Sequence, residues 1–119
     1  MINTHTQPVD EETYTTLQEI MGDEFAELVN FFREDAEQAL ATLPHAIDTA
    51  NGIDVGGICH KLKSSSRLIG AMEMAEFARL LEEYKRHQNQ QLARTHLNAL
   101  AHEYSRVLAW LENHPIHSI

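Results

Sequence analysis

The residues that could do chemistry in this 119-residue chain are concentrated in one short segment, from His60 to Arg67. The histidine is followed by Lys63, Ser64 and Arg67, at offsets of one and two helical turns. At about 100° per residue, these three side chains lie within about 60° of His60 on a helix. A neutral imidazole is a nucleophile near neutral pH, and a neighbouring cation can hold phosphoryl oxygens. The segment therefore has the parts of an exposed phosphoryl acceptor, although the same residues also fit an ordinary solvated surface.

Two adjacent glycines, Gly56 and Gly57, precede the histidine by about one turn and lie on the same helix face. A glycine inside a helix costs roughly 1 kcal/mol relative to alanine. We expect this cost to be offset by close approach of another surface, unless the helix begins later. The glycines, together with Ser64 and Arg67, are therefore predicted to form a docking surface around His60. The opposite face of this helix is apolar and includes Val55, Ile58, Leu62 and Ile69.

Apolar residues recur three to four positions apart in five segments, which is the spacing of amphipathic helices. The first is a short helix that Asp10 caps and Gly22 ends. Four longer helices follow, with apolar positions over 25–47, 55–69, 74–84 and 93–111, and Asn51 and Gly52 close the first of these. Pro44 predicts a kink or break near Leu43. No segment alternates with the period of a strand. The sequence predicts an all-α fold, an antiparallel four-helix bundle with a short additional N-terminal helix.

One domain is expected, because two halves of this chain would each be too small for a good core. We assign residues 1–9 to a flexible leader, 10–113 to the bundle and 114–119 to a short C-terminal tail. Nine Lys and Arg against 18 Asp and Glu give a net charge of −9, which disfavours nucleic acid and anionic membranes as partners. No apolar run approaches the ~18 residues of a membrane helix, and no signal peptide is apparent. We expect a cytoplasmic protein.

Eight histidines and one cysteine raise the question of metal or redox chemistry. The di-iron pattern of helical bundles needs a glutamate three residues before a histidine, and no histidine here has an acidic residue at that position. We expect no metal site. Cys59 flanks the apolar stripe and is expected to be a core thiol, with a redox sensor as the alternative. Trp110 is expected to pack in the core, whereas Phe31 could be exposed for docking or packed at an edge.

The segment His60 to Ala71, HKLKSSSRLIGA, resembles the signature of the histidine-containing phosphotransfer (HPt) domain. That signature is a histidine, an apolar residue two positions on, a lysine three positions on, small residues and a Gly-Ala turn. The resemblance extends from about Thr13 to Trp110. It implies a four-helix bundle whose histidine receives and passes on a phosphoryl group. By this resemblance, His60 matches the phosphoacceptor and Lys63 the lysine that helps to hold the phosphoryl oxygens.

Two positions need comment against the family pattern. Ser64 stands where the family most often has glycine, and its side chain narrows access to the histidine. Glu82 falls where members often place a polar side chain, in several cases glutamine, that hydrogen-bonds the histidine ring. A glutamate would make the ring more basic but would repel the phosphate. A solvated acid beside Glu83 is therefore the alternative for Glu82.

The resemblance also implies what the protein does and with what. We expect a phosphorelay intermediate that carries phosphohistidine and is not an enzyme with self-contained catalysis. Its expected partners are the receiver domains of a hybrid histidine kinase and of a response regulator. The receiver would supply Mg²⁺ and its own lysine, and the chain itself no cofactor. The N-terminal Met and the short tails favour a free-standing protein, with an excised domain as the alternative, and we expect a monomer. The alternative is an interaction module, a similar bundle that binds receiver or kinase domains without carrying phosphate.

Overall fold

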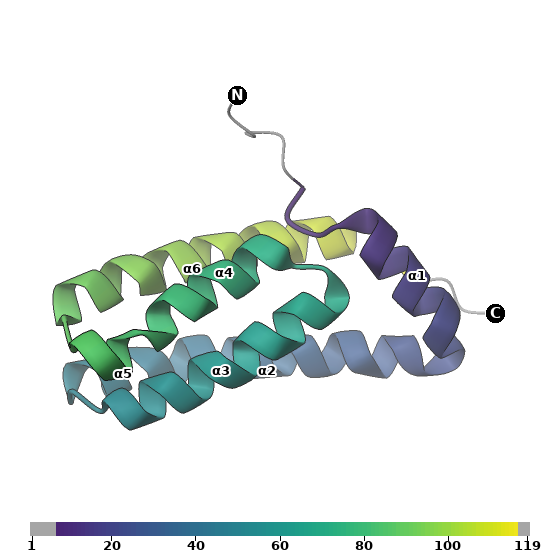
Figure 1. The fold of residues 1–119 in the computed structure, drawn as a ribbon. Helices are drawn as coiled ribbons and strands as arrows, with labels where there is room; N and C mark the ends of the chain where they lie inside the picture. The colour runs from purple at the N-terminus through teal and green to yellow at the C-terminus, as the bar shows by residue number, and fades with distance from the viewer. Residues whose placement is uncertain (1–6, 117–119) are drawn as a thin grey trace.

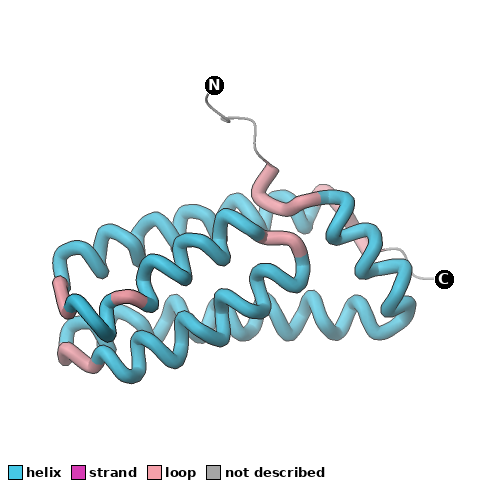
Figure 2. Tube along the Cα trace, viewed as in Figure 1, coloured by secondary structure: helices cyan, strands magenta, loops and turns pink. Residues whose placement is uncertain are grey.

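The computed structural model describes residues 7–116, which form helices joined by short connections (Figure 1). The elements follow one another as α1 (Glu11–Met21), η1 (Gly22–Glu24), α2 (Phe25–Asp48), α3 (Gly52–Ile69), α4 (Met72–Glu82), α5 (Tyr84–His87) and α6 (Gln90–Glu112). Figure 2 shows only helix and short loops over this part of the chain. The all-α four-helix bundle predicted from the sequence is confirmed.

The four long sides of the bundle are α2, α3, α4 with α5, and α6 (Figure 1). Helix α1 crosses one end of the bundle and leads through the single turn of η1 directly into α2. The chain between α3 and α4 is a tight turn in which Gly70 adopts a positive φ of 93°. Glycine tolerates this conformation because it lacks a Cβ atom. The turn lays α4 back along α3 and brings their facing residues together.

Side-chain caps set the starts of three helices. Asp10 accepts a hydrogen bond from the Thr13 amide at 3.2 Å, and Asn89 caps α6 in the same way. Asn51 accepts from the Asp54 amide at 3.1 Å, so it begins α3. The sequence prediction that Asn51 and Gly52 close the preceding helix is therefore wrong, because α2 already ends at Asp48. An asparagine side chain satisfies the free amides of a helix start.

Helix α2 continues without a break through Pro44. A proline removes one helical hydrogen bond. Here it lies on the exposed side, while Leu43 and Ile47 beside it are fully buried. Packing of these two side chains holds the last turn in place. The predicted break near Leu43 is thus wrong, and the alternative, a kink, stays a prediction.

The bundle extends beyond residues 10–113 at both ends. Val9 is fully buried, and the Asp10 amide donates to the Gly70 carbonyl at 2.8 Å. At the other end, the His114 ring stacks on Trp110 with centroids 3.7 Å apart, and Ile116 packs against the core. Residues 9, 114 and 116 therefore do not belong to a loose leader or tail. The predicted leader and tail positions 1–6 and 117–119 lie outside the described residues.

The core confirms two expectations about single residues. Cys59 is fully buried, and burial followed by the nearby charge of Glu82 raises the pKa of its thiol to about 12. Such a thiol stays protonated and unreactive, as expected for a core residue. Trp110 is 5% exposed and packs edge-to-face on Tyr14, with ring centroids 4.9 Å apart. Within the described residues, no helix combines the length and apolar character needed to cross a membrane.

Candidate functional site

His60 lies in the middle of α3 and faces solvent, with 68% of its side chain exposed. The rotation of the helix is fixed by its opposite face, where Val55 and Leu62 are fully buried. Turning α3 to hide the imidazole would expose both of these side chains, at a cost of about 1.5–3 kcal/mol each. The apolar stripe therefore holds His60 at the surface.

A carboxylate from the last residue of α4 contacts the imidazole. Glu82 Oε2 lies 3.3 Å from His60 Nδ1, and only 11% of the Glu82 side chain is exposed. A carboxylate oxygen only accepts hydrogen bonds, so this contact places the hydrogen of a neutral ring on Nδ1. The lone pair of such a ring is then on Nε2. The sequence alternative of a solvated acid is wrong, because Glu82 is held between α3 and α4.

Two lysines share the same carboxylate. Lys63 Nζ donates to Glu82 Oε1 at 2.9 Å, and only 18% of the Lys63 side chain is exposed. Lys85 Nζ, from α5, lies 3.7 Å from Oε2. We refer to Glu82, His60, Lys63 and Lys85 as the Glu82 cluster.

The charge state of the cluster follows from these contacts. Burial on its own would raise the pKa of Glu82. Hydrogen bonds and charges from Lys63 and His60 outweigh the burial and hold this pKa below its usual value. Glu82 is therefore an anion near neutral pH.

The two glycines predicted for docking have different surroundings. Gly57 is exposed, and a Cβ atom there would have no atom within 4 Å. Gly56 is buried, and a Cβ atom there would lie 2.7 Å from Lys85 Cδ. Gly56 is thus not part of an exposed docking surface, and that prediction is wrong. The close approach that its glycine permits is made by a side chain of the same protein.

Ser64 and Arg67 are both exposed on α3, on the side of the helix predicted from the sequence. The Ser64 hydroxyl donates back to the His60 carbonyl at 3.3 Å, one turn earlier. The pKa of Glu76 on α4 is lowered, mainly by a hydrogen bond from Arg79 and against a smaller effect of burial. The positive charge of Arg67 adds to this lowering. Neither side chain belongs to the Glu82 cluster.

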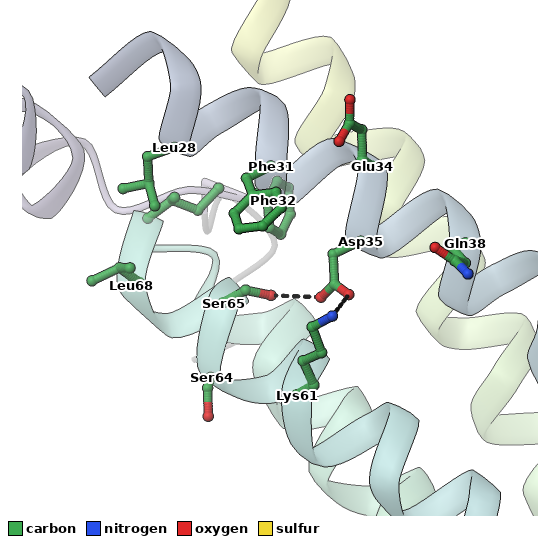
Figure 3. A pocket seen from close by; sticks show the side chains of 11 residues that line it. Leu28, Phe31, Phe32, Glu34, Asp35, Gln38, Lys61, Ser64, Ser65 and Leu68 are labelled. Carbon is green, nitrogen blue, oxygen red and sulfur yellow. Dashed lines mark hydrogen bonds and ion pairs between the residues drawn. The ribbon is translucent and has the colours of Figure 1, made fainter. Parts of the chain in front are cut away.

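A groove of about 400 Å³ runs between α2 and α3 beside this face. Figure 3 shows Asp35 between the two helices, contacting Ser65 Oγ at 3.2 Å and Lys61 Nζ at 3.3 Å. Phe31 is 70% exposed and Leu68 is 48% exposed at the groove. Of the two alternatives for Phe31, an exposed ring or a ring packed at an edge, the structure shows the exposed one. Its position about 100° from the apolar stripe of α2 was the sequence signal for this.

Sequence reasoning missed Lys85. It lies in a polar stretch with no helical periodicity, and α5 has only four residues. The available signal was its spacing of three from Glu82, because opposite charges at this spacing meet on a helix. The signal is weak, since the same spacing also joins Glu83 and Arg86 in an ordinary surface pair.

Comparison with known proteins decides the family. The model of the Hpt domain matches residues 27–110, which include His60, Lys63 and Glu82. The chain belongs to the Hpt family. Hpt domains are phosphotransfer carriers that interact with receiver domains and kinases in phosphorelays. This confirms the family resemblance read from the segment around His60.

Two solved structures are similar to this Hpt domain. Histidine-containing phosphotransfer protein B (HptB) from Pseudomonas aeruginosa PAO1 is 28% identical with a TM-score of 0.78, over 85% of this chain and 90% of that one. The histidine-containing phosphotransfer protein ZmHP2 from maize is 25% identical with a TM-score of 0.75, over 85% of this chain and 78% of that one. Among curated proteins, none matches the chain by sequence.

Proposed function

We propose that His60 is the phosphoacceptor of this Hpt domain, and that the chain is a phosphorelay intermediate between two receiver domains. The observation that carries the proposal is the exposed imidazole whose Nδ1 lies 3.3 Å from Glu82 Oε2. This contact orients the ring and leaves Nε2 as the nucleophile. Nothing else in the Glu82 cluster is both exposed and nucleophilic, because its lysines are cations.

The proposed transfer is a displacement at phosphorus. The Nε2 lone pair of His60 attacks an aspartyl phosphate on the first receiver, an N–P bond forms, and the P–O bond breaks as the aspartate carboxylate leaves. The ring keeps its Nδ1 hydrogen and becomes positively charged, and the anionic Glu82 stabilises that charge. An aspartate carboxylate of the second receiver then attacks the phosphorus, and the N–P bond breaks to return the neutral imidazole.

The phosphoryl group brings close to two negative charges at neutral pH. Lys63 is the cation one turn along α3 from His60, so it is the side chain we assign to the phosphoryl oxygens. Mg²⁺ and a second lysine are expected on the receiver, and no cofactor on this chain. In this proposal the protein positions and carries the phosphoryl group, while the receiver supplies Mg²⁺ and the second lysine.

The receiver is proposed to dock over α2 and α3 around His60. Gly57 leaves open space next to the imidazole, and Ser64, one turn after His60, lines the α2–α3 groove. Exposed Phe31 offers an apolar contact, and Arg67 a positive charge for the acidic pocket of a receiver. The contact would be transient. We propose that the chain acts in the cytoplasm as a monomer.

The decisive experiment is label transfer from purified receiver domains phosphorylated with ³²P-acetyl phosphate. The wild-type chain should take up label that is lost in acid and retained in base, as expected for phosphohistidine. His60→Gln should take up none while keeping its circular dichroism spectrum. His45→Gln is the matched control, because His45 is an exposed histidine on α2. Acid-labile label on the His60→Gln variant would refute the assignment, and binding without label would support the interaction module instead.

A further inference from the structure

We propose that Lys85 is a positioning residue, which keeps Glu82 paired when Lys63 turns to a phosphoryl group on His60. The inference rests on the proposed function and concerns a step within it. It assigns a role to α5, whose four residues have none in the docking or chemistry described above.

The need for a second cation arises from the resting contacts. Lys63 donates to Glu82 Oε1 at 2.9 Å, so its ammonium is already engaged before any phosphate arrives. Contact with a phosphoryl group would draw Lys63 away from Glu82. The Glu82 side chain is only 11% exposed, and a carboxylate left unpaired in such a place is strongly disfavoured. Until the N–P bond forms, the attacking ring of His60 carries no positive charge, so Lys63 is held back by Glu82 unless another cation replaces it.

Lys85 is placed to be that cation. Its Nζ lies 3.7 Å from Glu82 Oε2, too far for a good hydrogen bond but close enough to form one after a small shift. The Lys85 side chain is 55% exposed, so the ammonium has room to move. It approaches the oxygen that His60 also contacts, whereas Lys63 holds the other oxygen. Lys85 can thus strengthen its own contact without first displacing Lys63.

Two glycines of α3 make room for the Lys85 side chain. A Cβ atom at Gly52 would lie 3.0 Å from Lys85 Cα, and one at Gly56 would lie 2.7 Å from Lys85 Cδ. The glycines are one turn apart, so they form a bare strip on α3 along which the Lys85 stem lies. Gly56, inside the helix, costs roughly 1 kcal/mol of helix propensity relative to alanine. The benefit is a lysine stem held on a fixed path, which directs its ammonium towards Glu82.

The test uses phosphoramidate, a small donor that needs no receiver. Its P–N bond breaks to release ammonia as the N–P bond to His60 forms. Rates of the wild-type chain and of the variants are compared at one fixed pH. Lys85→Met keeps the stem but removes the ammonium, and should slow phosphorylation about fivefold. Lys85→Arg should restore most of the rate. Lys61→Met is the matched control, because it removes an exposed lysine of α3 that pairs with Asp35 outside the cluster.

Double mutants separate this role from a general effect of charge. If Lys85 acts by releasing Lys63, Lys85→Met should change nothing in a Lys63→Met background. It should also change nothing in a Glu82→Gln background, because a neutral glutamine no longer holds Lys63 back. A direct attraction between Lys85 and the donor would instead give the same loss in all backgrounds, and that result would overturn the inference.

Gly56→Ala gives a second, independent test of the role of Lys85. The added methyl group should displace the Lys85 stem and slow phosphorylation, although alanine favours the helix and should not lower its stability. An unchanged rate for both Gly56→Ala and Lys85→Met, with a wild-type chain that is labelled on His60, would overturn the inference and leave the proposed function intact. A wild-type chain that takes up no label on His60 would instead overturn the proposed function and with it the role of Lys85.

Discussion

Replacing Glu82 by glutamine should measure the electrostatic contribution of the cluster to stability, because glutamine keeps the shape of the side chain and removes its charge. Glu82 joins α4 to α3 through Lys63 at 2.9 Å and His60 at 3.3 Å. Glutamine can accept a hydrogen bond with one end of its amide, but its NH₂ group would face the other donor. The contact with the ring survives only if the ring hydrogen moves from Nδ1 to Nε2, and the ion pair with Lys63 disappears in either case.

The loss of folding stability expected for Glu82→Gln lies between two limits. Removing one partner of a buried ion pair costs about 3–5 kcal/mol, and exposed pairs contribute about 0.2–1 kcal/mol. Glu82 and Lys63 are near the buried limit at 11% and 18% exposure, whereas His60 at 68% is near the exposed one. The remaining Lys63 ammonium can also turn towards water. We expect a loss of about 1–2 kcal/mol, which for a chain of this size lowers Tm by about 4–8 °C.

The pH dependence of this loss has a defined sign. The pKa of Glu82 is lowered in the folded protein by Lys63 and His60 against its burial. Its contribution is therefore complete above the unfolded pKa of about 4.3 and disappears as the pH falls through the lower folded value. The Tm difference between wild type and Glu82→Gln should be full at neutral pH and vanish in strong acid.

Thermal unfolding followed by circular dichroism across this pH range provides the assay. Glu83→Gln is the control, because this neighbouring glutamate pairs with Arg86 on the surface of the same segment. It should leave the Tm at neutral pH unchanged within error. Equal Tm values for wild type and Glu82→Gln at neutral pH would refute the electrostatic role. A Tm difference that persists undiminished in strong acid would show that the loss is one of packing.

Three further substitutions test other parts of the site. Lys63→Ala should slow label transfer to and from a receiver about tenfold without changing the circular dichroism spectrum, and unchanged rates in both directions would remove Lys63 from the site. Leu62→Asp places a charge at a fully buried position and should destabilise the bundle by more than about 3 kcal/mol, so an unaltered melting temperature would contradict the orientation of α3. Gly57→Arg fills the open space beside His60 and should weaken receiver binding in calorimetric titration, whereas an equal Kd would place docking elsewhere.

The part of the site that lies on one helix could be predicted from the sequence. Helical geometry places Lys63 one turn from His60, and the apolar stripe through Leu62 fixes which way both face. These relations depend only on spacing within α3 and on burial of its apolar side. The structure shows His60 exposed and Leu62 buried, as this reasoning requires.

The part that depends on contacts between helices could not be derived from spacing on one helix, and Glu82 was expected as a partner of the ring only through the family resemblance. Glu82 lies 22 residues from His60 in the chain, so its pairing depends on how the Gly70 turn lays α4 along α3. Gly56 was predicted to be exposed from its angle on the helix alone. That angle says nothing of α5, whose Lys85 covers the glycine and whose four residues leave no periodic pattern.

The charges of the cluster explain why a glutamate can occupy a site that we propose accepts phosphate. Before transfer, the lysines 63 and 85 carry two positive charges against the single negative charge of Glu82, so the cluster has one positive charge in excess. The phosphoryl group adds close to two negative charges, and the imidazole becomes positive as it forms the N–P bond. The phosphorylated cluster is then close to neutral. Without Lys85, Lys63 alone would have to neutralise both Glu82 and the phosphoryl group on a chain that already carries −9, and Glu82 would hold it back from the phosphate.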